Sequence, residues 1–289
     1  MTSIKTHSIA INVRIKRYNT MVWFLCLLSI LASCTEKTQE TPLGVYAKIG
    51  KIPPPDGFVR DTTGIDSFAL YLRNLDLKED KTVYLYNGQK KTNQDAQFAV
   101  VKMDVGNRDL QQCADAVIRL RAEYLFGRKE YKRIHYNFTN GERAEYKSYA
   151  EGDRPVLLNN QVRWARTAKR DYSYKTFRKY LDVVFTYAGT LSLNAELMKI
   201  SVDEIQPGDI FIQTGYPYGH AVMVADVAIN KQTGQRAFML VQSYMPAQEI
   251  HVLKNPDKNN NPWYTIAYGH DLHTPEWTFK SIDLRRFND

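Results

Sequence analysis

Pro207-Gly208-Asp209-Ile210-Phe211-Ile212, followed after a short glycine-bounded loop by Gly219-His220-Ala221-Val222-Met223-Val224, is the most informative stretch of the chain. Pro and Gly favour a turn, and the apolar runs that follow predict strands at 210–213 and 220–229. Because only a short loop separates them, we expect neighbouring antiparallel strands. His220 would then open the second strand at its exposed end.

Further elements follow from the spacing of apolar residues on either side of this stretch. Period-two alternation and turn signals predict strands at 82–86, 98–105, 236–244 and 249–253. Helical spacing predicts helices at 66–77, 107–126 and 176–193, the second capped by Asn107 or Asp109. Within the otherwise unassigned segment 130–166, His135–Gly141 indicates a strand and a turn at Asn140-Gly141. Helices followed by antiparallel strands favour an α+β domain.

The first 33 residues are typical of an export signal. Four basic residues and no acidic residue precede the apolar run 22–31, which at ten residues is too short to span a bilayer. The run ends in Leu31-Ala32-Ser33-Cys34, which resembles the lipobox of bacterial lipoproteins. This resemblance implies lipid attachment at Cys34, a cell-envelope location and anchoring to the outer membrane. We expect a polar tether at 34–52 and one domain at 53–289, with an N-terminal addition at 53–106 and its main part at 107–289.

The net charge and the cysteine content limit which partners and which chemistry the protein can have. The net charge of +8 includes the four basic residues of the signal, so the remainder carries +4, and we expect no nucleic-acid partner. Of the three cysteines, Cys26 is removed with the signal and Cys34 takes the lipid. Cys113 is then the single thiol, either buried in the core or used in chemistry.

A cysteine, a histidine and an amide together provide the roles of a cysteine hydrolase. Cys113 near a helix start is the candidate nucleophile, because a helix N-terminus and an imidazolium both stabilise a thiolate. His220 is the candidate base, and Gln242, or less well Ser243, would orient its ring. Backbone N–H groups at the helix start would bind the oxyanion.

The Gly-Asp turn, strand and Gly-His strand resemble the histidine half of the papain-like cell-wall hydrolases of the NlpC and CHAP types. The resemblance implies a papain-like α+β domain, an upstream cysteine matched by Cys113, and a polar residue matched by Gln242 or Ser243. It also implies amidase or peptidase activity on cell-wall peptide. The long gap between Cys113 and His220 requires an insertion within 129–175. Because Cys113 also lies on the apolar stripe of its helix, a purely structural role stays open.

Nearly the whole mature chain resembles an uncharacterised family of Bacteroidetes lipoproteins, domain of unknown function 4846. The resemblance rests on segments 111–116, 135–141, 186–192 and 242–248, and it implies a Gram-negative envelope without implying an activity.

Several other polar and aromatic residues have both a functional and a structural interpretation. Arg119 and Arg121 on the helix of Cys113 either receive a substrate carboxylate or face water. His270 and His273 suggest zinc only weakly, so we expect no metal and no cofactor. His251 is interpreted as a packed or surface residue. Three tryptophans line a glycan groove or, more simply, fill the core: Trp164, Trp263 and Trp277.

Two alternatives to the hydrolase remain at this point. The chain could be a non-catalytic envelope lipoprotein that binds a glycan or a protein, or an acyltransferase in which an amine intercepts the thioester. The sequence fixes neither the substrate nor the oligomeric state.

Overall fold

Strands β8 (Ile210–Gln213) and β9 (His220–Ile229) pair antiparallel, as predicted, in the middle of a large sheet. The computed structural model describes residues 46–62, 67–158, 161–258 and 261–288, all within one unit at Leu43–Asp289. The predicted export signal, Cys34 and most of the predicted tether lie outside the described residues.

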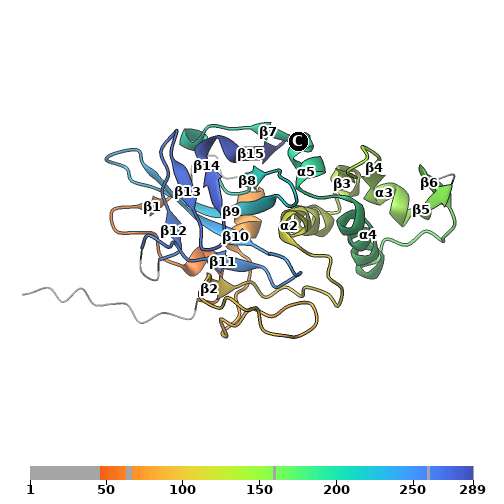
Figure 1. Ribbon diagram of the computed structural model, residues 1–289, viewed down its shortest axis with the longest axis horizontal. Helices are drawn as coiled ribbons and strands as arrows, with labels where there is room; N and C mark the ends of the chain where they lie inside the picture. Colours follow the sequence, from red (N-terminus) through yellow and green to blue (C-terminus); the bar gives the residue numbers. More distant parts are fainter. Residues whose placement is uncertain (1–45, 63–66, 159–160, 259–260, 289) are drawn as a thin grey trace, which may run out of the picture. The chain divides into compact units, whose positions relative to one another are not determined.

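The sheet runs in the order β2, β11, β10, β9, β8, β15, β7 (Figure 1). Its strand pairings among the described residues are antiparallel, and β1 adds to β9 while β12 adds to β10. Its other strands are β1 (Val59–Arg60), β2 (Gln97–Val100), β7 (Leu197–Lys199), β10 (Arg236–Gln242), β11 (His251–Leu253), β12 (Trp263–Tyr264) and β15 (Leu284–Phe287).

Three separate hairpins and several helices complete the described chain. The hairpins pair β3 (His135–Asn137) with β4 (Arg143–Glu145), β5 (Asp153–Leu158) with β6 (Gln161–Arg166), and β13 (Asp271–His273) with β14 (Thr278–Lys280). The helices are α1 (Ser67–Arg73), α2 (Cys113–Gly127), α3 (Tyr146–Ala150), α4 (Tyr174–Tyr187) and α5 (Thr190–Glu196). Short 3-10 turns occupy Ile49–Lys51, Tyr131–Arg133, Val202–Glu204 and Ser281–Asp283. The α+β class is therefore confirmed.

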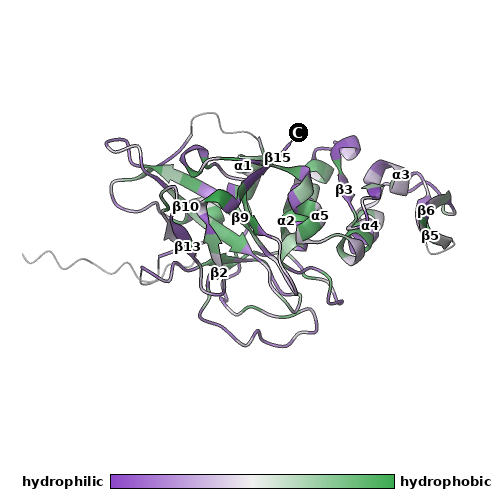
Figure 2. Ribbon diagram, turned by 45° about the horizontal axis from the view of Figure 1, so that its top comes forward, coloured by the Kyte–Doolittle hydropathy of each residue, from purple (hydrophilic) through white to green (hydrophobic). Residues whose placement is uncertain are grey.

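Strand β9 is buried on both of its faces. Ala221 and Met223 belong to the larger core cluster with residues of α2, whereas Val222 and Val224 pack with Phe211 in the smaller cluster. Such two-sided burial explains the nearly continuous apolar run of the strand. Figure 2 shows the same run as hydrophobic ribbon in β9 and β10.

One buried acid interrupts this run and ties the N-terminal segment to the sheet. Asp226 is fully buried and accepts hydrogen bonds from Arg60 at 2.7 Å and from Arg73 at 2.5 Å. A buried carboxylate is tolerated only when it is paired, so these two guanidiniums are required by its position. Residues of the predicted N-terminal addition thus contact the centre of the sheet.

Several predicted boundaries were wrong. Helix α2 is capped by Gln112, because Asp109 instead accepts a hydrogen bond from the Ala247 N–H at 2.7 Å. The helix predicted at 176–193 is two helices separated by extended backbone at Ala188-Gly189. Segment 82–86 forms only isolated bridges, since side chains of Gln94 and Glu249 accept hydrogen bonds from its N–H groups.

Smaller corrections concern the ends of other elements. The α1 helix, β2 and β10 each end earlier than predicted, at Arg73, Val100 and Gln242. The tether was predicted to reach Ile52, but Ile49 and Ile52 are buried in the core. The turn predicted at Asn140-Gly141 is confirmed, since it joins β3 to β4 with Gly141 at φ +87°. Within the described ranges, no helix has both the length and the apolar character that a bilayer crossing needs.

Two glycines of the opening stretch are required by close contacts. Gly208 has φ +96°, and a Cβ there would lie 2.9 Å from the Phe68 ring. A Cβ on Gly219 would lie 2.2 Å from the Gln213 carbonyl oxygen and 2.5 Å from the Thr190 hydroxyl oxygen. The second glycine therefore lets α5 and the end of β8 approach the residue before His220.

We expect Gly219→Ala to destabilise the fold by about 1 to 3 kcal/mol, because its Cβ would overlap a backbone carbonyl. Urea unfolding measures the change. Gly127→Ala is the matched control: a Cβ there meets no heavy atom within 4 Å, so stability should be unchanged or slightly higher. Equal stability of the wild type and Gly219→Ala would contradict this close approach.

Candidate functional site

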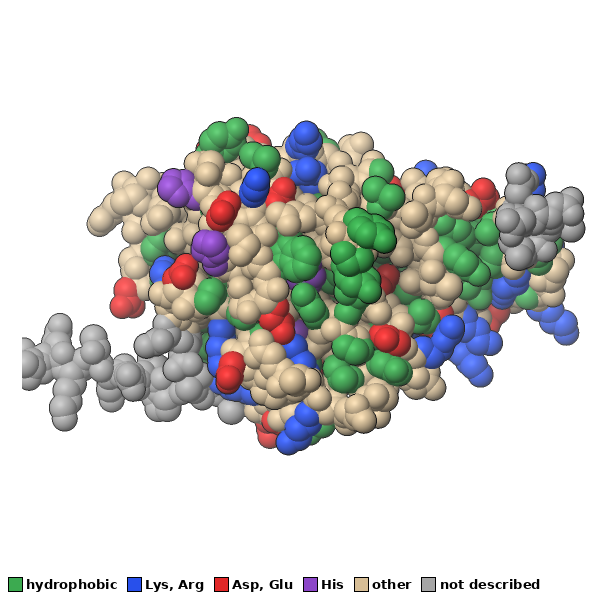
Figure 3. Space-filling model, in the orientation of Figure 1, with side chains coloured by type: hydrophobic (Ala, Val, Ile, Leu, Met, Phe, Trp, Pro, Cys, Tyr) green, Lys and Arg blue, Asp and Glu red, His purple; other side chains and the backbone are tan. Residues whose placement is uncertain are grey.

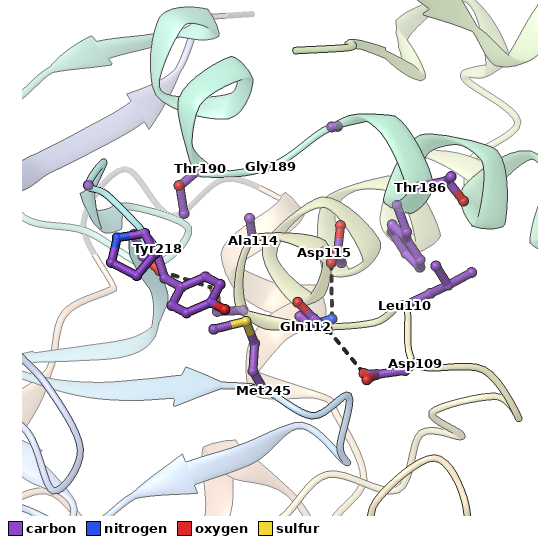
Figure 4. Close-up of a pocket in the computed structure, with 16 residues that line it drawn as sticks. Asp109, Leu110, Gln112, Ala114, Asp115, Thr186, Gly189, Thr190, Tyr218 and Met245 are labelled. Atoms are coloured by element: carbon purple, nitrogen blue, oxygen red, sulfur yellow. Dashed lines mark hydrogen bonds between the residues drawn. The ribbon is translucent and has the colours of Figure 1, made fainter.

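A cleft of about 410 Å³ opens at the N-terminus of α2. Its walls come from the start of α2, the α4–α5 connection, the β8–β9 loop and the segment after β10, represented by Cys113, Asp115, Thr186, Gly189, Tyr218 and Met245. Figure 4 shows Tyr218 and Met245 at one end of the cleft and Leu110 and Thr186 at the other. Figure 3 shows hydrophobic side chains gathered on the surface over the same elements. Tyr218 is 61% exposed at this rim.

Cys113 is the first residue of α2 and lines the cleft, although only 8% of its surface is exposed. Its Sγ lies 3.9 Å from the carbonyl oxygen of Gly219, the residue before His220. The N-terminal position of the thiol, predicted from sequence, is therefore confirmed. Its catalytic role stays a prediction.

The surroundings of Cys113 favour the neutral thiol. Burial raises its pKa to about 11, and the neighbouring Asp115 carboxyl adds to this increase. Backbone N–H groups of Ala221, Ala114 and Cys113 itself lower the pKa, but by less than burial raises it. The resting protein thus holds a thiol rather than a thiolate at neutral pH.

His220 opens β9 and is oriented by Gln242 on the neighbouring strand β10. Its Nε2 lies 2.9 Å from the Gln242 Oε1, and its ring packs against the rings of Tyr244, Trp277 and Phe279. Burial lowers the pKa of His220 to about 4, against the hydrogen bond to Gln242, which raises it. The ring is therefore neutral at pH 7.

The partners of Gln242 fix which nitrogen of His220 carries the proton. The Gln242 Nε2 donates to the Glu276 carboxylate at 2.8 Å and faces the His251 Nε2 at 3.3 Å. Since a carboxylate only accepts hydrogen bonds, the amide Oε1 must face His220, whose Nε2–H donates to it. The Nδ1 of His220 then keeps its lone pair, and it has no hydrogen bond within the described ranges.

Charged and polar residues behind Gln242 extend this network. Lys91 pairs with Glu276 at 2.7 Å, and the Nδ1–H of His251 donates to the Glu249 carbonyl oxygen at 2.9 Å. Burial lowers the pKa of His251 to about 3 and lowers that of Lys91 as well. Sequence reasoning assigned no role to Lys91 or Glu276, because neither is near His220 in the chain and neither belongs to a motif.

The sequence-predicted trio is brought to one end of β9, but not into a single hydrogen-bonded chain. The Cys113 Sγ meets the main chain of Gly219, immediately before His220. No hydrogen bond joins the Sγ to the imidazole, although both residues are among those described. Ser243, the alternative orienting residue, instead places its Oγ 2.8 Å from the carbonyl oxygens of Gln111 and Gln248.

The other polar predictions have varied outcomes. Arg119 and Arg121 do not face water: Arg119 is 1% exposed and bound by Asp104, Gln111 and Glu123, and Arg121 stacks on aromatic rings. His251 is buried, which agrees with the first of the two interpretations, a packed rather than a surface residue. Trp263 is core, whereas Trp277 is half-buried beside His220 and Trp164 stacks on Phe138. Within the described ranges, His270 and His273 are not part of a group of three metal-binding side chains.

Comparison with known proteins gives a family. The family described as domain of unknown function 4846 matches residues 49–286. The chain belongs to this family. No curated protein and no solved structure matches the chain. Membership covers every residue of the cleft and of the Gln242 network, so the site lies within the family's domain.

The depressed pKa of His220 predicts a pH dependence of stability. Between pH 6.5, its ordinary pKa, and about 4, the unfolded chain binds a proton that the folded chain does not. Stability is therefore lost as pH falls through this window, by about 1.4 kcal/mol per pH unit for one histidine.

We expect His220→Asn to flatten the dependence of the unfolding free energy on pH by that amount between pH 4.5 and 6. Urea unfolding at several pH values measures it. His251→Asn should flatten the curve similarly, because burial also lowers the pKa of His251, to about 3. Parallel curves for the wild type and His220→Asn would show that the ring is not held neutral.

Proposed function

We propose that the chain is a papain-like cysteine amidase or peptidase that cleaves peptide amide bonds, with cell-wall peptide as its substrate. Cys113 is the nucleophile, His220 the base and Gln242 the positioning residue. The observation that supports this most is the fixed tautomer of His220, which leaves an Nδ1 lone pair one residue from the Gly219 carbonyl that the Cys113 Sγ contacts. A ring nitrogen left without a donor suits a base better than a purely structural histidine, whose polar atoms are normally hydrogen-bonded.

In the proposed reaction, the Cys113 thiol gives its proton to the Nδ1 of His220 as the Sγ attacks the substrate carbonyl carbon. The oxyanion accepts hydrogen bonds from backbone N–H groups at the start of α2, which have no partner within the helix. The imidazolium then protonates the leaving amine, the C–N bond breaks, and a thioester remains. Water, deprotonated by His220, releases the acid and restores the thiol.

The proposed reaction begins with Cys113 and His220 both neutral, because burial keeps the thiol and the imidazole uncharged. The Sγ must leave the Gly219 carbonyl and come within hydrogen-bonding distance of the Nδ1 when substrate enters the cleft. Imidazole then acts as a general base in the attack itself, and a pre-formed thiolate is not needed. An incoming amine in place of water would give acyl transfer on the same scaffold.

The second candidate function is a non-catalytic protein that binds a peptide or glycan in the cleft. Its support is the low exposure of Cys113 and the raised pKa of the thiol, both of which suit a core residue. The exposed Tyr218 and the other hydrophobic rim residues would then bind the ligand.

A peptidyl acyloxymethyl ketone separates the two candidates, because its reaction with a thiol depends on an activating imidazole. We expect the wild type to be labelled at Cys113 at pH 7.5, and His220→Ala at least about 100-fold more slowly. Intact-mass spectrometry follows the rate. His273→Ala, which changes an exposed histidine, should react like the wild type. Equal rates for the wild type and His220→Ala, or no labelling of either, would leave the binding function.

We also propose that the protein is a lipid-anchored envelope lipoprotein, on the strength of the lipobox-like segment before Cys34. Cells grown with radiolabelled palmitate should incorporate label into the wild type and into Cys113→Ser, but not into Cys34→Ser. The unlabelled variant should also leave the membrane fraction. Label retained by Cys34→Ser would rule out this anchor.

A further inference from the structure

A second pocket, of about 290 Å³, lies beside the cleft and shares Leu110 and Phe185 with it. It is formed by the 104–111 loop and helix α4, and it contains no residue of the proposed catalytic trio. In Figure 4, Leu110 marks the end of the cleft from which this pocket begins. A chain bound across Cys113 could therefore extend into it.

Two residues that line this pocket each carry a buried hydrogen-bond donor that has no acceptor among the described residues. Gln111 is 1% exposed, and its Nε2 has no partner among the described residues. The Nη1 of Arg178 is likewise buried and without a hydrogen-bond partner in the described part of the chain. Unsatisfied buried donors are costly, and two in one pocket indicate a ligand that accepts hydrogen bonds.

The orientation of the Gln111 amide is fixed by its other end. Its Oε1 accepts a hydrogen bond from the Arg119 Nη1, so its Nε2 cannot exchange places with the oxygen without opposing that guanidinium. The donor end of the amide is therefore the end that has no partner among the described residues.

The acidic residues of the pocket already have cationic partners. Asp104 accepts from Arg119 at 3.3 Å and from the Gly106 N–H at 2.7 Å. Asp182 lies 3.7 Å from Arg108. Among the described residues, Arg178 is in no ion pair, so it is the charged side chain of the pocket lining that has no counter-ion.

We propose that this pocket is a carboxylate-binding subsite, in which Arg178 and Gln111 donate hydrogen bonds to a carboxylate of the bound peptide. Guanidinium and amide donors together match the two oxygens of a carboxylate. Gln111 lies two residues before Cys113, so a carboxylate held here fixes a peptide next to the thiol. The peptide character of the ligand rests on the proposed function, whereas the carboxylate preference does not.

Binding is measured by isothermal titration on Cys113→Ala protein, so that catalysis plays no part in the result. The probes are N-acetyl-alanyl-alanine with a free carboxylate and the same dipeptide ending in a carboxamide. We expect the carboxylate to bind at least about 10-fold more tightly than the carboxamide. Equal affinity for the two probes would overturn the proposal.

Two substitutions assign the preference to this pocket. Arg178→Gln should reduce carboxylate affinity to that of the carboxamide, and Gln111→Glu should do so while keeping an oxygen for Arg119. Lys179→Gln, at the exposed neighbouring position of α4, should leave both affinities unchanged. Thermal unfolding checks that each variant folds. A carboxylate preference that survives Arg178→Gln, or is lost in Lys179→Gln, would place the binding elsewhere. Because every measurement uses Cys113→Ala protein, these outcomes do not depend on whether Cys113 is catalytic in the wild type.

Discussion

Burial of β9 on both faces is the constraint from which the site follows. The strand lies between β8 and β10 and must be apolar on each side, so its polar chemistry is confined to its ends and to one paired acid, Asp226. At its beginning, Gly219 allows the backbone to approach α5, and His220 enters the edge of the core. The same strand packs against α2, which brings Cys113 to that end of the sheet.

A polar network then fixes the tautomer and the orientation of the buried His220 ring. Neutral imidazole has two tautomers, and a single hydrogen-bond partner whose amide could rotate would not choose between them. Glu276 determines the tautomer, because its carboxylate accepts a hydrogen bond from the amide nitrogen of Gln242 and the amide oxygen therefore faces His220. Lys91 in turn balances the charge of the Glu276 carboxylate. The orientation of the His220 ring thus depends on three residues from separate parts of the chain, Lys91, Gln242 and Glu276.

The cleft and the neighbouring pocket share the loop before α2. The backbone carbonyl oxygen of Gln111 accepts a hydrogen bond from Ser243, and its side-chain oxygen accepts one from Arg119. Its side-chain nitrogen has no partner among the described residues. Gln112, rather than Asn107 or Asp109, caps the helix that starts at Cys113. The proposed nucleophile and one proposed carboxylate donor, Gln111, therefore lie two residues apart on a segment that these hydrogen bonds hold.

The sequence by itself determined the β8–β9 pairing, the α+β class and the helix start near Cys113, because local turn chemistry and apolar periodicity carry these features. It also indicated that His220 opens a strand and that Gln242 rather than Ser243 better suits its ring. Only the tertiary structure showed that Glu276 and Lys91 lie behind Gln242, that Arg178 lines a pocket, and that Arg119 is buried. These features depend on contacts between residues far apart in the chain. Residue type and spacing do not predict which distant side chain will contact a given donor.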